Sequence, residues 1–201
     1  MTLPRPTHIL YLHGFRSSPL SAKARVVGRR LLACSPSPRW ACPQLPPSPA
    51  EAIALCDTLV RDWPRERMAL IGSSLGGFYA TVLAERLGCP AVLYNPAVHP
   101  ARDLARHLGE QRSWHRPEDR FFFRPEFIGE LQRLTPARLT RPERYHPVIA
   151  TGDEVLDWRE MRDRYAGAPA LIVQGGDHAL TRFEGPLAWT LQALGLDREG
   201  A

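Results

Sequence analysis

The sequence of 201 residues predicts a single α/β domain with a mostly parallel sheet of about six strands and helices on both faces. Three observations lead to this prediction. Short apolar runs alternate with longer amphipathic segments, which is the pattern of a sheet covered by helices. Glycine-containing turns follow several of the apolar runs. The hydrophobic fraction of 44% is enough for a full core.

The elements follow one another in βαβ order. The expected strands are the apolar runs at 8–12, 40–45, 68–71, 91–95, 148–151 and 170–174. Pro43 removes a backbone donor from the second run and places it at an edge of the sheet. The expected helices are 21–34, entered through Pro19, then 50–63, preceded by a proline-rich loop, 78–87 and 182–194.

Residues 100–145 interrupt this rhythm. The segment contains no convincing strand and is rich in Arg, Pro and Phe. Because it stands between two expected strands, we interpret it as an insertion within the single domain 1–201. We expect two or three short helices that form a cap over the top of the sheet. Phe121-Phe122-Phe123 would anchor this cap or, alternatively, form a wall of an acyl-binding site.

Composition and charge argue against several classes of protein. The net charge is +5, but the arginines are spread along the chain among acidic residues, so no nucleic-acid partner is expected. No apolar stretch approaches the ~20 residues of a membrane helix, and no signal peptide is evident behind Met1, so we expect a cytoplasmic protein without a membrane partner. The four cysteines have no metal-ligand spacing, so no metal is expected.

The residues Gly72-Ser73-Ser74-Leu75-Gly76 carry the strongest functional signal. They stand between the apolar run 68–71 and the helical segment 78–87. This is the sequence form of a nucleophile elbow, a tight strand-to-helix turn that exposes one serine. Glycines two residues before and after Ser74 allow the strand and the helix to pass closely. Ser74 is therefore the predicted nucleophile.

A serine nucleophile needs a histidine base and a carboxylate that orients the histidine. Both follow in the order that this chemistry uses on an α/β sheet. The run 148–151 leads into Asp153, and the run 170–174 leads through a Gly-Gly turn into His178. Glu154 and Asp157 compete with Asp153, which is preferred because it lies nearest the end of the strand.

Two backbone amides are the candidates for an oxyanion hole. One is the amide of Leu75, directly after the serine, and the other is the amide of Phe15, in the loop after the first strand. His13, in the same loop, is expected to brace the loop rather than to act as a base. Asn95 could orient a loop or touch a substrate, although a turn-forming role before Pro96 is favoured.

Several motifs resemble those of the α/β-hydrolase superfamily, and more closely those of the small bacterial esterase family called YqiA, an uncharacterised UPF family. They are LYLHGFRSSPLSAKA at 10–24, GSSLGGFYA at 72–80, LYNPAVHP at 93–100, TGDEVLDWR at 151–159 and GGDHAL at 175–180. The resemblance covers nearly the whole chain. It implies an α/β-hydrolase fold and esterase action on small acyl esters, with acyl-coenzyme A thioesters as a further substrate class. It also implies that no metal or organic cofactor takes part.

These observations together predict a serine hydrolase with Ser74, Asp153 and His178 as its triad. Alternatives within the class are a small peptidase and a lactone hydrolase. The alternative from another class is a non-catalytic binding protein with the same fold. Phosphate groups of coenzyme A would have potential partners in the ten arginines of residues 101–144.

Overall fold

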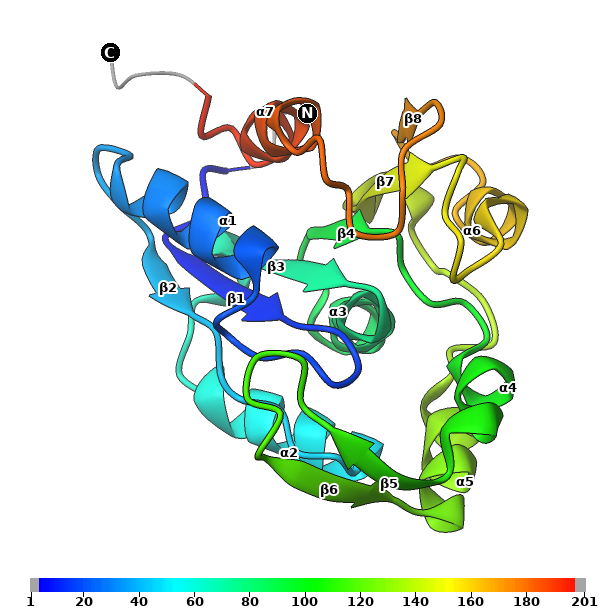
Figure 1. Cartoon of the computed structure of the whole chain (residues 1–201). Helices are drawn as coiled ribbons and strands as arrows, with labels where there is room; N and C mark the ends of the chain where they lie inside the picture. Colours follow the sequence, from blue (N-terminus) through cyan, green and yellow to red (C-terminus); the bar gives the residue numbers. More distant parts are fainter. Residues whose placement is uncertain (1–3, 198–201) are drawn as a thin grey trace.

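The structure, a computed structural model, describes residues 4–197 and has a parallel six-stranded sheet at its centre (Figure 1). The strand order is β2-β1-β3-β4-β7-β8, and every neighbouring pair is parallel. The strands are β1 (His8–Leu12), β2 (Arg39–Ala41), β3 (Met68–Ser73), β4 (Ala91–Tyr94), β7 (Tyr145–Ala150) and β8 (Leu171–Val173). The predicted fold class is therefore confirmed.

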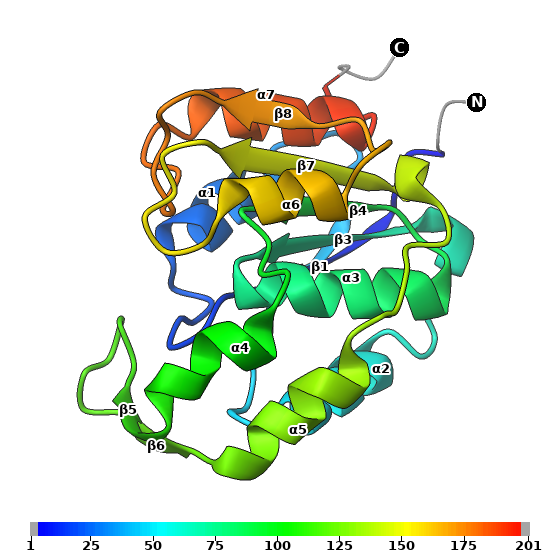
Figure 2. The same cartoon turned by 90° about the vertical axis from the view of Figure 1, so that its right-hand side faces the viewer.

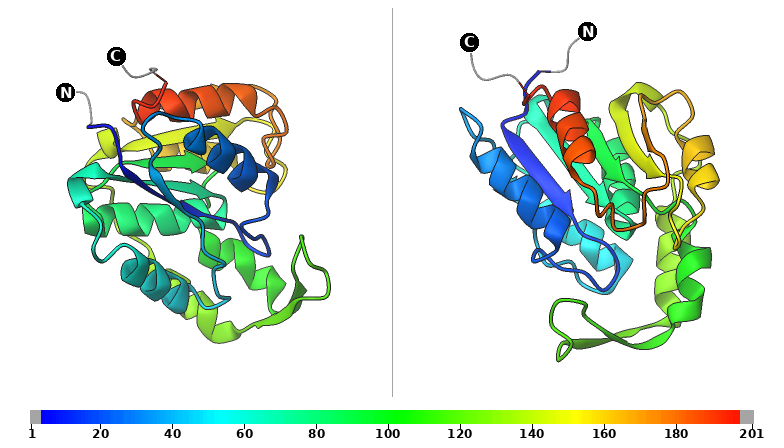
Figure 3. Two further views of the ribbon diagram at one scale, coloured as in Figure 1. Left: turned by 90° about the vertical axis from the view of Figure 1, so that its left-hand side faces the viewer. Right: turned by 45° about the horizontal axis from the view of Figure 1, so that its top comes forward.

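Helices cover both faces of the sheet (Figures 1 and 3). One face carries α1 (Ala22–Leu32) and α7 (Glu184–Ala193), and the other carries α2 (Pro49–Leu59), α3 (Leu75–Leu87) and α6 (Trp158–Arg164). The first residues of α1 and α2 follow serine caps, in which the side chains of Ser21 and Ser48 accept backbone N–H groups. Three short 3-10 helices connect elements at Arg65–Arg67, Ala105–His107 and Pro142–Arg144.

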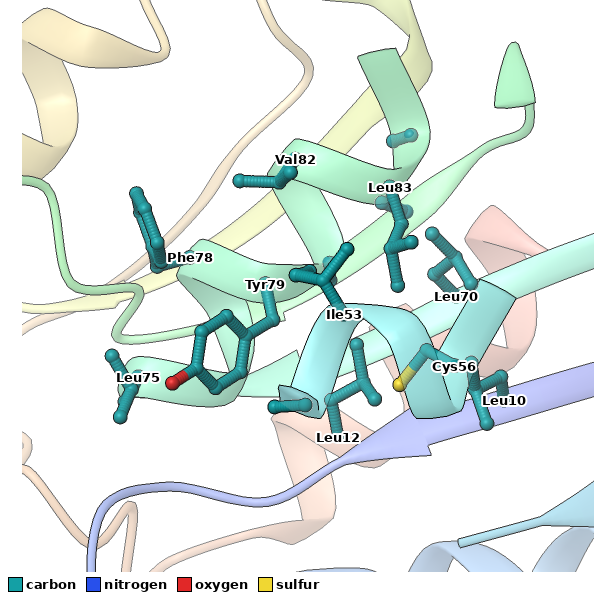
Figure 4. Packing of buried hydrophobic residues seen from close by; sticks show 14 of the residues in the cluster. Leu10, Leu12, Ile53, Cys56, Leu70, Leu75, Phe78, Tyr79, Val82 and Leu83 are labelled. Atoms are coloured by element: carbon teal, nitrogen blue, oxygen red, sulfur yellow. The ribbon is translucent and has the colours of Figure 1, made fainter. Parts of the chain in front are cut away.

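The core lies in two apolar layers, one on each face of the sheet. Alternate residues of a strand point to opposite faces, so Leu10 and Leu12 of β1 belong to one layer while Ile9 and Tyr11 belong to the other. Figure 4 shows the first layer, in which β1 and β3 pack against α2 and α3. Helix α3 is buried from Leu75 to Ala84, which explains why its sequence is apolar on all sides.

Most element boundaries agree with the sequence prediction within a few residues, and the edge strand differs most. Strand β2 ends at Ala41, before Pro43. The observed strand is therefore shorter than the expected one at 40–45 and starts one residue earlier. It does lie at an edge, as predicted. Strand β7 begins at Tyr145, because Tyr145 and Pro147 are buried beside β4 although their sequence is not a continuous apolar run.

The segment between β4 and β7 contains a structure that the sequence analysis missed. Besides α4 (Pro100–Leu104) and α5 (Pro125–Leu134), it forms an antiparallel hairpin of β5 (Gly109–Arg112) and β6 (Arg120–Phe123). The prediction that 100–145 contains no strand is therefore wrong. Strand β5 is Gly-Glu-Gln-Arg, and a polar strand of this kind has no apolar run that would reveal it. Helix α5 lies beside α2, on the outer side of the helical layer, and the hairpin leads into α5 (Figure 2).

The three consecutive phenylalanines of β6 have different environments. The ring of Phe123 is fully buried and packs edge-on against Phe15, with 5.2 Å between ring centroids, and against Phe127 of α5. Phe121 also packs on Phe15, whereas Phe122 points outward and is 59% exposed. Phe123 therefore anchors the hairpin to the domain, as the favoured interpretation expected.

The tip of the hairpin contacts the loop that follows β1. Arg16 Nε donates to the carbonyl oxygen of Arg112 at 2.8 Å, and Trp114 N donates to the carbonyl oxygen of Arg16 at the same distance. The Arg16 guanidinium also lies 4.0 Å from the centre of the Trp114 ring, a cation–π geometry. The loop that carries Phe15 is thus held in place from two sides.

No helix among residues 4–197 has both the length and the apolar character needed to cross a bilayer.

The different burial of Phe122 and Phe123 leads to a prediction about the free energy of unfolding. Phe123→Ala should lower the free energy of unfolding by about 3–5 kcal/mol, because it leaves a cavity in the core. The matched variant Phe122→Ala should change it by less than about 0.5 kcal/mol, since the ring is mostly exposed. Urea denaturation of the three proteins measures both values. Equal losses in the two variants would contradict the anchoring role.

Candidate active site

Ser74 lies in the sharp turn between β3 and α3, and its backbone has the strained conformation φ 56°, ψ −121°. Such a positive φ is unfavourable for a residue with a side chain and occurs where the surrounding structure enforces it. Hydrogen bonds on both sides enforce it here, from Ser74 N to the Tyr94 carbonyl oxygen and from Ala97 N to the Ser74 carbonyl oxygen. The Ser74 side chain is partly exposed, whereas that of Ser73 is buried.

The glycines around Ser74 allow three backbone segments to meet. A Cβ atom added at Gly76 would lie 2.0 Å from the Leu12 carbonyl oxygen, and one at Gly72 would lie 2.3 Å from the Gly76 carbonyl oxygen. No side chain fits at either position, as the sequence analysis expected. Gly14 lies against Ser74 in the same way, with its added Cβ 3.2 Å from Ser74 Cβ.

His178 and Asp153 are in direct contact at the same edge of the sheet. His178 Nδ1 and Asp153 Oδ2 are 2.7 Å apart, and the Asp153 side chain is completely buried. The other carboxylate oxygen of Asp153 accepts the N–H groups of Val155 at 2.8 Å and Leu156 at 2.9 Å. Asp153 is thus rigidly held, and its charge fixes which ring nitrogen of His178 carries the proton.

The two other carboxylates considered for the acidic position have different partners. Glu154 Oε2 accepts the backbone N–H of His178 at 3.0 Å, so it supports the loop and not the ring. Asp157 caps α6, where its side chain accepts the N–H of Arg159. Of these three acids, only Asp153 contacts the imidazole.

Parallel strands bring their carboxyl ends to one edge of the sheet, and the predicted residues gather there. Phe15 follows β1, Ser74 follows β3, Asp153 follows β7 and His178 follows β8. In the described part of the chain, no hydrogen bond joins Ser74 Oγ to His178. In ligand-free sites such bonds are often long and tighten only when substrate binds.

The two predicted oxyanion donors belong to segments next to Ser74: Leu75 follows it in the chain, and Phe15 follows Gly14, which lies against Ser74. Leu75 is the first residue of α3, where backbone N–H groups have no acceptor inside the helix. Within residues 4–197, neither amide donates a hydrogen bond to another protein atom. Both donors are therefore available to an oxygen atom placed above Ser74, and the positive end of the α3 dipole favours negative charge at that point.

His13 braces the loop after β1. Its Nε2 accepts the N–H of Leu45 at 3.1 Å, and its Nδ1 lies 3.1 Å from the Gly14 carbonyl oxygen. Nδ1 therefore carries the proton and the ring is neutral. Burial lowers the pKa of His13 to about 4. These contacts confirm the structural role that the sequence analysis preferred.

Asn95 has a larger role than a turn residue. Its side chain is buried, and its Nδ2 donates to the carbonyl oxygens of Asp177 at 3.2 Å and His178 at 3.1 Å. Its Oδ1 accepts the N–H of Ala150 at 2.8 Å. One amide thus joins the ends of β4 and β7 to the loop of His178. The favoured interpretation, a simple turn-forming Asn, missed this; the Asn-Pro pair after a strand was the available signal.

Lys23 is a second residue whose position the sequence did not reveal. It is the only lysine of the chain, and its Nζ donates to the Ala179 carbonyl oxygen at 2.8 Å, next to His178. Burial lowers the pKa of Lys23 to about 8, although the charges of Asp177 and Asp153 oppose the shift. The isolated lysine among many arginines was its only signal.

A pocket of about 780 Å³ opens beside Ser74. Its walls are the loops 13–20 and 44–47, the first turns of α3, and residues 113–121 of the hairpin. Leu75 and Phe15, whose amides are the predicted oxyanion donors, belong to its wall. Phe121 belongs to its wall, so one of the three phenylalanines has the position that the alternative interpretation assigned to them.

In the described part of the chain, no group of three or more His, Cys, Asp or Glu side chains is placed to hold a metal ion.

Comparison with known proteins assigns the chain to a family. Residues 8–194 match the uncharacterised protein family UPF0227, and the chain belongs to this family. Similar solved structures include alpha/beta hydrolase domain-containing protein 10 from mouse, with a TM-score of 0.67 and 18% identity over 94% of this chain and 88% of that one. The esterase domain of a Rhodothermus marinus protein has a TM-score of 0.66 and 18% identity over 96% and 86% of the two chains. These likenesses show that the chain has the α/β-hydrolase fold.

Because His13 is buried in its neutral form, we expect the free energy of unfolding to depend on pH. The folded pKa of His13, about 4, lies below the ordinary value of 6.5, so the unfolded chain binds a proton first as the pH falls. The stability contribution is therefore complete above pH 6.5 and is lost progressively down to about pH 4. The lost amount is about 3 kcal/mol at most.

His13→Gln keeps an acceptor for Leu45 N and removes the titration. Urea denaturation between pH 7 and pH 4 should show a shallower loss of unfolding free energy for the variant than for the wild type. Identical pH slopes would show that His13 can be protonated without disturbing the loop.

Proposed function

We propose that this member of UPF0227 is a serine hydrolase that cleaves carboxylic esters, with acyl-coenzyme A thioesters as a further substrate class. The observation that carries the proposal is the 2.7 Å contact between His178 and the buried Asp153, at the sheet edge where Ser74 is held in a strained turn. The similarity to solved esterases of the same fold supports it.

The mechanism follows from these positions. Ser74 Oγ attacks the acyl carbon and forms a new C–O bond, while His178 takes the hydroxyl proton. Asp153 orients His178 and stabilises the imidazolium. The amides of Phe15 and Leu75 hold the oxyanion of the tetrahedral intermediate.

The intermediate then breaks its bond to the alcohol or thiol, and His178 protonates this leaving group. Water, deprotonated by His178, then attacks the acyl-Ser74 ester and forms a second tetrahedral intermediate. This intermediate breaks its bond to Ser74 Oγ, which regains a proton from His178, and the carboxylic acid is released. Every bond formed and broken is thus accounted for by the chain, the substrate and one water molecule.

Anionic leaving groups such as coenzyme A have candidate partners at the pocket. Arg116 and Arg120 belong to its wall, and Arg120 is also paired with Glu110 at 2.9 Å. Guanidinium groups bind phosphate with two parallel hydrogen bonds, which suits the phosphates of coenzyme A.

The first prediction concerns the nucleophile. Ser74→Ala should leave folding intact and lower kcat by several orders of magnitude, because no other group can form the acyl intermediate. Ser73→Ala is the matched control and should cost far less. Hydrolysis of p-nitrophenyl esters from acetate to palmitate, with acyl-coenzyme A in parallel, measures the rates and the substrate range.

A fluorophosphonate probe tests the same assignment independently of the substrate. Mass spectrometry should find the label on Ser74 in the wild type and no label in Ser74→Ala. A folded wild-type protein that stays unlabelled would support the alternative, a non-catalytic protein that uses the fold for binding.

The second prediction separates Asp153 from Asp157. Asp153→Asn should keep the melting temperature and lower kcat about 10⁴-fold, because the amide no longer fixes the tautomer of His178. Asp157→Ala should instead cost about 0.5–2 kcal/mol of stability through the lost helix cap, with a much smaller effect on rate. Thermal unfolding and esterase assays of both variants measure this. An inactive Asp157→Ala beside an active Asp153→Asn would refute the assignment of the acid.

A further inference from the structure

The hydroxyl group of Tyr79 makes no hydrogen bond to the described part of the chain, although the residue as a whole is almost fully buried. Tyr79 is only 3% exposed, and it belongs to the wall of the pocket beside Ser74. Three of the five tyrosines behave differently, since the hydroxyls of Tyr94, Tyr145 and Tyr165 are hydrogen-bonded to Thr190, Glu85 and Thr81. Tyr11 also lacks a partner, but its hydroxyl is sealed inside the core. The Tyr79 hydroxyl is not sealed in this way and belongs to a residue of the pocket wall, so it is a free donor that a ligand in the pocket can use.

Tyr79 lies close to the proposed oxyanion site. It stands four residues after Leu75 in α3, on the same face of the helix and about 6 Å along its axis. Side chains in a helix lean toward its N-terminus, and Figure 4 shows the Tyr79 ring extending toward Leu75 with its oxygen foremost. The hydroxyl therefore lies on the Leu75 side of the ring, toward the end of α3 that follows Ser74.

The composition of the pocket wall indicates which half of an ester enters it. The wall residues all lie between His13 and Phe121, and none comes from the loops of Asp153 and His178. The leaving group must stay near His178, which protonates it. The part of the pocket at Leu75 and Tyr79 therefore accommodates the acyl group, whereas Arg116 and Arg120 remain for the distant phosphates of a coenzyme A leaving group. The lining also includes apolar side chains, among them Leu45, Leu55 and Phe121, together with charged ones such as Arg116.

We propose that the pocket selects acyl groups that carry an ether or carbonyl oxygen a few bonds beyond the ester carbonyl, and that Tyr79 donates a hydrogen bond to this oxygen. The inference rests on the proposed hydrolase function. A plain alkyl chain would fill the apolar part of the pocket but leave the Tyr79 hydroxyl without a partner and without water, which is unfavourable.

The environment of the ring keeps it a hydrogen-bond donor. Burial raises the pKa of Tyr79 far above its usual range, and the nearby Cys56 and Glu130 raise it further. The phenol therefore stays protonated throughout the pH range of an esterase assay.

The test compares wild type and Tyr79→Phe on p-nitrophenyl hexanoate and on two analogues in which an ether oxygen replaces the methylene at C4 or C5. Ethers are used because hydroxyl groups at these positions would form lactones. Each kcat/KM is divided by the hydroxide-catalysed rate of the same ester, which removes the electronic effect of the oxygen. The wild type should prefer at least one ether analogue over hexanoate by about tenfold, the order expected for one hydrogen bond.

Tyr79→Phe should abolish this preference and should raise the rate on hexanoate, because no unpaired hydroxyl is left beside the alkyl chain. Retained hydrolysis of hexanoate also shows that the variant folds. Tyr165→Phe is the control, because it removes a buried hydroxyl outside the pocket and should keep the wild-type preference. A wild type without preference, or a preference that survives in Tyr79→Phe, would overturn the inference.

If the proposed hydrolase function itself is wrong, the experiments give a different pattern of results. If the fluorophosphonate probe does not label Ser74 and no ester is hydrolysed, both proposals fall. Labelling of Ser74 together with equal normalised rates on all three esters overturns only the role of Tyr79.

Discussion

The close crossing of three backbone segments at Gly72, Gly76 and Leu12 is the constraint on which the site depends. Only hydrogen atoms fit between the end of β1, the end of β3 and the start of α3. This contact sets the direction in which α3 leaves the sheet and forces Ser74 into its strained backbone conformation. The same crossing brings the loop of Phe15 beside Ser74, so one packing contact determines the serine and both amides together.

The elements that the sequence predicted best are those with local signals. The strands β1, β3 and β4 at the centre of the parallel sheet are buried apolar runs. The turn at Ser74 has glycines two residues before and after the serine, a spacing typical of a nucleophile elbow. Asp153 and His178 could be predicted because each follows an apolar run within a few residues, and the structure brings them into contact. The hairpin of β5 and β6 could not, because β5 is polar and its stability comes from Phe123 packing on distant residues.

Long-range contacts between side chains and backbone explain the remaining omissions. Asn95 binds backbone atoms up to 83 residues away, and Lys23 binds one at a distance of 156 residues. Neither interaction leaves a periodic pattern in the sequence. Both hold the loop that presents His178, so the precision of this loop depends on residues that no local motif identifies.

The parts of the chain that form the pocket walls affect how related proteins can diverge in the acyl groups they accept. The walls of the pocket beside Ser74 come from the first half of the chain and from the hairpin, whereas the proposed base and acid come from the last third. Substitutions or length changes at the hairpin tip can therefore reshape the chamber without touching the groups that transfer protons. An architecture of this kind permits new acyl preferences to arise by drift in one exposed segment while the chemistry is inherited unchanged.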